Sequence, residues 1–141
     1  MALELISLEK AIASLSRSIQ ITRSAADDPA LDPDLKATLR AGVIQNFKVA
    51  YELSWKFMQR WLRENQTPEE ADFPRTRKEL FRLAARSGLI PDPLPWFAYG
   101  DARNLTSHIY DVKKAEIVYL QALQFLSDAQ ILLEGLRAHN D

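Results

Sequence analysis

The segment RNLTSHIY, at positions 103–110, holds the side chains best suited to chemistry. His108 is one of two histidines in the chain, and an unperturbed imidazole titrates at about pH 6.5, so it can take up a proton near neutrality. Arg103 keeps its charge and presents a planar fork of donors that fits phosphate oxygens. These residue types suit phosphodiester cleavage without a metal, with the imidazole as general base and the guanidinium stabilising charge on the phosphate.

The spacing within this segment does not by itself make a catalytic pair. On an ideal helix Arg103 and His108 lie about 140° apart around the axis, whereas Asn104 shares a face with His108 and could orient it or a phosphate. Two arrangements would bring Arg103 and His108 together: the helix ends between residues 106 and 110, or a two-fold dimer places two copies across one cleft. A structural alternative also remains, in which the segment only ends one helix before Asp111 caps the next.

The elements that must position this segment are all expected to be helices. Apolar residues recur at steps of three and four, no stretch shows the alternation of a strand, and proline-containing breaks separate the periodic segments. Gly88 suits a left-handed helix C-terminus, and Asp111 suits an N-cap. The expected helices span 3–25, 34–64, 75–87, 93 or 94 to 103–108, and 112–137. This pattern predicts one all-α domain over 1–141, an antiparallel up-and-down four-helix bundle with one short extra helix.

The composition excludes several classes of protein. With 141 residues and no cysteine, the chain has neither a disulfide framework nor a thiolate metal site, which fits a reducing compartment. A net charge of −1 excludes a generally basic nucleic-acid coat. The first residues lack a basic leader, and no window resembles a membrane span. We therefore expect a cytoplasmic protein with no membrane association.

A second set of candidates is basic. Lys78, Arg82 and Arg86 step by four and would form one ridge on the third helix. Such a ridge could follow an RNA backbone or meet an acidic face of a partner protein. The alternative is an ordinary solvated helix face.

Glu52 is the third candidate, because a carboxylate among bulky apolar neighbours costs free energy unless it is paired. It could orient Arg103 or His108 from behind, or it could simply be exposed. His139, the other histidine, lies far away near the C-terminus without metal-ligand spacing, so we expect no metal site and no bound cofactor.

Two longer stretches carry a resemblance to a known family. VIQNFKVAYELSWKFMQRWL (43–62) and GLIPDPLPWFAYGDARNLTSHIYD (88–111) resemble the nucleotidyltransferase substrate-binding proteins, which belong to the HEPN superfamily. With the helix pattern, the resemblance covers nearly the whole chain. The superfamily's mark is Arg, four to six residues, then His, and the longer form Arg-x-x-x-x-His-x-Tyr, here Arg103, His108 and Tyr110, is similar to that of HepT-like toxins.

This resemblance implies a function. It points to a homodimer in which paired motifs line a groove, and to a metal-independent endoribonuclease toxin. Its antitoxin would be a minimal nucleotidyltransferase that silences the nuclease by adding AMP to Tyr110. Cleavage assisted by a 2′-hydroxyl would leave a 2′,3′-cyclic phosphate and a free 5′-hydroxyl. The alternative within the same family is a non-catalytic subunit that docks on a nucleotidyltransferase and presents a substrate.

Overall fold

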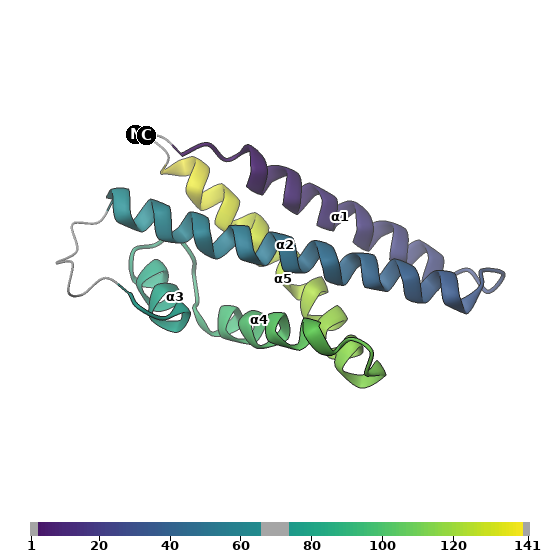
Figure 1. Ribbon diagram of the computed structural model, residues 1–141. Helices are drawn as coiled ribbons and strands as arrows, with labels where there is room; N and C mark the ends of the chain where they lie inside the picture. The colour runs from purple at the N-terminus through teal and green to yellow at the C-terminus, as the bar shows by residue number, and fades with distance from the viewer. Residues whose placement is uncertain (1–2, 66–73, 140–141) are drawn as a thin grey trace.

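The computed structural model describes residues 3–65 and 74–139, and these residues form α-helices with no strand (Figure 1). The helices are α1 (Ile6–Ala26), α2 (Pro33–Asn65), α3 (Arg77–Arg86), α4 (Leu94–Leu105) and α5 (Val112–Ala138), with a short 3-10 helix, η2 (Thr106–His108), between α4 and α5. The predicted all-α class is confirmed, and the helix boundaries lie close to those expected from the sequence.

The long helices form the body of the bundle. α1 and α2 lie side by side and antiparallel, and α5 packs against both (Figure 1). α4 contacts α2 and α5 as the fourth helix, while α3 is the short extra helix and contacts α2 and α4. This arrangement confirms the predicted helical bundle. Within the described ranges, no helix has the length and apolar character needed to cross a bilayer.

An aromatic cluster at the centre of the core fixes α4 against α2 and α5. The ring of Phe125 on α5 lies 5.2 Å from that of Phe47 and 6.3 Å from that of Tyr51, both on α2. The same ring lies 5.5 Å from Trp96 and 5.2 Å from Tyr99 on α4. All five side chains are buried, and each removes a large apolar area from water. Because Tyr99 is one turn before Arg103, this packing fixes the end of α4 where the candidate site begins.

Local sequence signals account for the helix ends. Gly88 has a φ of 80°, the left-handed conformation predicted for it after α3. Thr76 caps α3, because its hydroxyl accepts from the Glu79 amide at 3.2 Å, and the Glu79 carboxylate accepts from the Arg75 amide at 3.1 Å. Asp111 caps α5 by accepting from the second and third backbone amides of that helix at 2.9 and 3.3 Å. The predicted cap is confirmed.

Candidate active site

The segment 103–110 carries the chain from the end of α4 into a tight turn. α4 ends at Leu105, and residues 106–108 continue as η2. The Thr106 hydroxyl donates to the Arg103 carbonyl at 2.7 Å, and the Ser107 hydroxyl donates to the Asn104 carbonyl at 3.2 Å. These hydroxyls add side-chain hydrogen bonds to carbonyls of the last turn, and the Arg103 carbonyl also accepts from the Thr106 backbone N–H. The α-helix therefore ends within the expected range 103–108, one residue before the interval 106–110 in which its end was considered as a way to bring Arg103 to His108.

Arg103 is held by α2. Its side chain is about three-quarters buried, and its Nε donates to Glu52 Oε1 at 2.8 Å. Its Nη1 donates to the Thr106 hydroxyl at 3.2 Å. A guanidinium has five N–H donors, so this anchoring leaves other donors of the fork for an oxyanion. This contact agrees with the alternative considered from the sequence in which Glu52 orients Arg103.

Glu52 connects three helices. Its Oε2 accepts from Trp55 Nε1 at 3.0 Å on the same helix. Its Oε1 accepts a hydrogen bond from Arg103 Nε of α4 at 2.8 Å and lies 3.9 Å from Arg77 Nη1 of α3. The guanidinium carbon of Arg77 lies 4.6 Å from the centre of a Trp55 ring. Both carboxylate oxygens therefore have partners, which offsets the cost of partly burying the charge.

Gly100 of α4 leaves room for the Tyr51 hydroxyl of α2. A Cβ atom added at Gly100 would lie 3.0 Å from the Tyr51 hydroxyl oxygen, so the Tyr51 side chain would have to shift by a few tenths of an ångström. Burial raises the pKa of the Tyr51 hydroxyl, and the Arg77 cation opposes that rise. Tyr51 therefore stays neutral, and the centre of its ring lies 5.7 Å from the guanidinium carbon of Arg77.

His108 and Tyr110 lie on the outside of the turn. Both are exposed, and Tyr110 retains 82% of its accessible surface. His108 Nδ1 lies 3.4 Å from the Tyr110 hydroxyl oxygen, and the two rings meet edge to face at 6.0 Å. Which of the two groups donates depends on the tautomer of the imidazole. Tyr110 therefore presents its hydroxyl to solvent directly beside the histidine.

Within one copy of the chain, Arg103 and His108 do not contact each other. Among the described residues, no hydrogen bond or ion pair links Arg103 to His108, and Asn104 is exposed. Ending the helix at Leu105 is therefore not sufficient to form the pair by direct contact. Of the two arrangements considered from the sequence, pairing across a dimer remains a prediction.

The family model for nucleotidyltransferase substrate binding protein like proteins matches residues 3–138. The chain belongs to this family. The resemblance noted from residues 43–62 and 88–111 is therefore confirmed.

Individual relatives agree with this family membership. Over 103 residues, covering 73% of this chain and 70% of the relative, the chain is 46% identical to a Haemophilus influenzae protein named probable ribonuclease HepT. A solved Haemophilus influenzae structure, described as the fold of a substrate binding domain of a nucleotidyltransferase, is similar with a TM-score of 0.88 and 38% identity over 95% of this chain and 99% of that one. A Thermus thermophilus structure is similar with a TM-score of 0.70 and 27% identity, covering 92% and 98% of the two chains.

In this member of the nucleotidyltransferase substrate-binding family, the basic ridge predicted on α3 lies away from Glu52. Lys78, Arg82 and Arg86 are exposed. Lys78 Nζ and the guanidinium of Arg82 lie over the Phe97 ring of α4, at 5.7 and 5.2 Å from its centre. None of the three contacts Glu52 in the described structure. The basic residue of α3 that reaches the candidate site is Arg77, which the sequence pattern did not identify.

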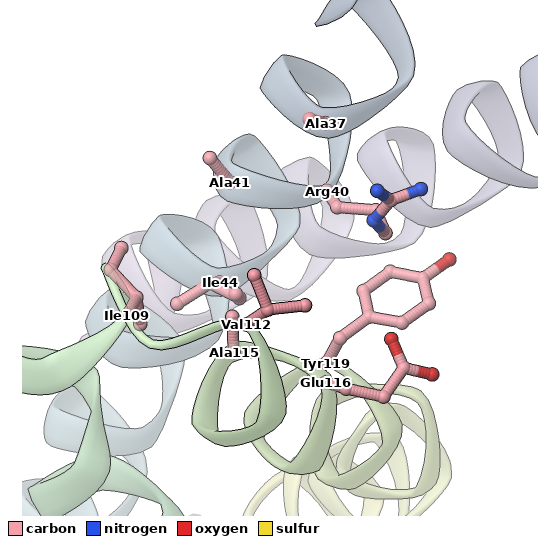
Figure 2. A pocket seen from close by; sticks show the side chains of 9 residues that line it. All are labelled: Ala37, Arg40, Ala41, Ile44, Ile109, Val112, Ala115, Glu116 and Tyr119. Atoms are coloured by element: carbon pink, nitrogen blue, oxygen red, sulfur yellow. The ribbon is translucent and has the colours of Figure 1, made fainter. Parts of the chain in front are cut away.

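A separate hollow adjoins the other end of the segment. It lies between α2 and the start of α5 and has a volume of about 210 Å³. Ile109 is the residue of the segment that lines it. Figure 2 shows Arg40, Tyr119 and Glu116 with their polar groups on one side of it, while Val112 and Ile109 contribute apolar surface. None of the predicted catalytic side chains lines this hollow, so we assign it no part in the chemistry.

The acidic and histidine side chains are scattered over the bundle. In the two described ranges, no three His, Cys, Asp or Glu side chains gather closely enough to hold an ion. The absence of a metal site and of a cofactor stays a prediction for the whole chain.

Proposed function

We propose that this chain is a HEPN-type toxin, a metal-independent endoribonuclease that a cognate minimal nucleotidyltransferase neutralises. One observation carries the proposal: the Tyr110 hydroxyl lies 3.4 Å from the His108 imidazole on an exposed turn that follows Arg103, which Glu52 anchors. A base, a phosphate-binding cation and a modifiable hydroxyl thus occupy one short segment. The name of the Haemophilus influenzae relative, probable ribonuclease HepT, supports the same activity.

The residues suggest the following cleavage step. The ribose 2′-oxygen attacks the adjacent phosphorus and the bond from phosphorus to the 5′-oxygen breaks. The neutral His108 ring takes the 2′-hydroxyl proton, and the 5′-oxygen takes a proton from solvent. Arg103 binds the phosphate oxygens and stabilises the charge of the transition state, while Asn104 orients the phosphate. The expected products are a 2′,3′-cyclic phosphate and a 5′-hydroxyl, and DNA should not be cleaved because it lacks the attacking group.

The site is proposed to form between two copies, because Arg103 and His108 do not meet within one chain. Mixing Arg103→Ala and His108→Ala proteins tests this directly. A mixed dimer pairs the intact arginine of one copy with the intact histidine of the other, so it should regain part of the activity that both parents lack. Purification as a monomer that still cleaves RNA would contradict the two-copy site.

Tyr110 is proposed as the residue through which the partner silences the nuclease. Its oxygen would attack the α-phosphorus of ATP, pyrophosphate would leave, and the phenolic proton would pass to solvent. AMP on this oxygen would occupy the space beside His108 and repel RNA phosphates. Co-expression with the nucleotidyltransferase should add mass to wild type and to Tyr119→Phe but not to Tyr110→Phe. Modification of Tyr110→Phe to the same extent would exclude this acceptor.

The second candidate is a non-catalytic subunit that docks on the nucleotidyltransferase and presents its substrate. The 0.88 TM-score to a structure described as a nucleotidyltransferase substrate binding domain favours it. It predicts a stable complex of the two proteins and no growth arrest when this chain is expressed alone. The toxin proposal predicts growth arrest that co-expression of the nucleotidyltransferase relieves.

A further inference from the structure

Two guanidinium groups converge on one carboxylate oxygen at the candidate site. Arg103 Nε and Arg77 Nη1 lie 2.8 and 3.9 Å from the same atom, Glu52 Oε1. Two cations share one anion here, so the cluster retains a net positive charge. Its side chains remain open to solvent, with 43% of Arg77, 27% of Arg103 and 24% of Glu52 accessible.

Arg77 is held in place before any ligand arrives. Its guanidinium carbon lies 4.6 Å from the centre of a Trp55 ring and 5.7 Å from that of the Tyr51 ring. Trp55 is itself fixed by its 3.0 Å hydrogen bond to Glu52. A planar fork that is already oriented loses less conformational entropy when it binds an oxyanion than a free side chain does.

We propose that Arg77 and Arg103 form a two-arginine site for the backbone of a single-stranded RNA substrate. Arg103 binds the scissile phosphate, and Arg77 binds a neighbouring phosphate of the same strand. Glu52 holds both guanidiniums from behind, so their free N–H groups are available to the RNA. This inference rests on the proposed ribonuclease function and gives α3 a part in substrate binding.

A purely structural role for Arg77 makes different predictions. The contacts with Glu52 and Trp55 could serve only to fasten α3 onto α2. In that case removing the charge would change stability and leave the electrostatics of RNA binding unchanged. Because contacts with phosphates release counterions, the salt dependence of RNA affinity separates the two roles.

The test measures binding of a fluorescently labelled oligoribonucleotide to folded protein carrying His108→Ala, which prevents cleavage during the titration. Arg77→Met keeps an unbranched side chain over Trp55 and removes the charge. The slope of log affinity against log salt should become shallower by about 0.7, the change expected for one single-strand phosphate contact. Arg77→Lys should restore most of the slope. The matched control is Arg60→Met, because Arg60 also lies over an aromatic ring, Phe57 at 5.1 Å, without contacting Glu52.

The outcomes separate this inference from the proposed function. An unchanged slope in Arg77→Met, in a protein whose wild type cleaves RNA, overturns the two-arginine site and leaves the nuclease intact. An equal loss of slope in Arg60→Met also overturns it, because the effect would then reflect overall charge. If wild type neither binds nor cleaves RNA, the proposed function itself fails.

Discussion

Replacing Glu52 by alanine should reduce ribonuclease activity while the fold is retained. The substitution removes the acceptor for Arg103 Nε at 2.8 Å and for Trp55 Nε1 at 3.0 Å. Arg103 would keep its bond to the Thr106 hydroxyl but lose its link to α2, so its guanidinium would sample several orientations. The mutation therefore changes the position of Arg103 relative to the phosphate. It does not change the chemistry of His108.

The expected size of the effect follows from the hydrogen bonds. A bond to a charged group contributes about 1.5–3 kcal/mol. Because about a quarter of the Arg103 and Glu52 side chains is solvent-accessible, we take the lower part of that range. A loss of about 1.5 kcal/mol in transition-state stabilisation corresponds to roughly a tenfold lower rate. The loss in unfolding free energy should also be about 1–2 kcal/mol, since the Trp55 N–H loses its acceptor.

The assay is cleavage of a labelled RNA in EDTA, with kcat and KM determined separately and unfolding followed in the same preparation. Glu52→Gln should fall between wild type and Glu52→Ala, because an amide oxygen still accepts a hydrogen bond but carries no charge. Glu64→Ala removes an exposed carboxylate from the same helix and should leave activity unchanged. The pH profile of kcat should keep its shape in all three variants, because His108 remains.

Unchanged kcat in a folded Glu52→Ala protein would refute this reasoning, since Arg103 would then need no support from α2. A loss of activity that follows the loss of stability at every temperature would refute it as well, because a general destabilisation would then account for the result.

Three further predictions concern the fold. Asp111→Ala should lower the unfolding free energy by about 1 kcal/mol in urea denaturation, because α5 loses its cap. An added Cβ at Gly135 would lie 2.8 Å from the Leu89 carbonyl oxygen, whereas one at Gly42 would meet nothing within 4 Å. Gly135→Ala should therefore destabilise by about 1–3 kcal/mol, and the control Gly42→Ala should stabilise by about 0.5–1 kcal/mol. Burial, followed by a hydrogen bond to a carboxylate of α5, raises the pKa of Tyr99. Above about pH 10 the unfolded chain loses a phenolic proton that the folded chain keeps, so stability should fall with rising pH, and Tyr99→Phe should reduce that fall.

Much of the fold could be predicted because its signals are local. Apolar periodicity identified the helices, and Gly88 and Asp111 marked helix ends that the structure places at the same residues. The end of α4 could be predicted only as the range 103–108, because Thr106 and Ser107 donate hydrogen bonds to carbonyls of the preceding turn, where the α-helix gives way to η2. Such side-chain competition at a helix end depends on geometry that periodicity does not report.

The site was only partly predictable because its contacts join different helices. Trp55 could have been associated with Glu52 from the sequence, since the two are three residues apart on one helix. Arg77 could not, because its position depends on how α3 folds back onto α2. The regular spacing of Lys78, Arg82 and Arg86 instead indicated another face of α3, from which Lys78 and Arg82 lie over Phe97 of α4.

RNA cleavage in EDTA by wild type, His108→Ala and His139→Ala, all free of AMP, is the most direct test of the proposed activity. His139 is the only other histidine, it is exposed, and it lies at the far end of α5, so its substitution controls for the loss of an imidazole. We predict products with 2′,3′-cyclic phosphate ends from wild type and His139→Ala, and none from His108→Ala. Equal cleavage by His108→Ala, or no cleavage by a folded, unmodified wild type, would contradict the account.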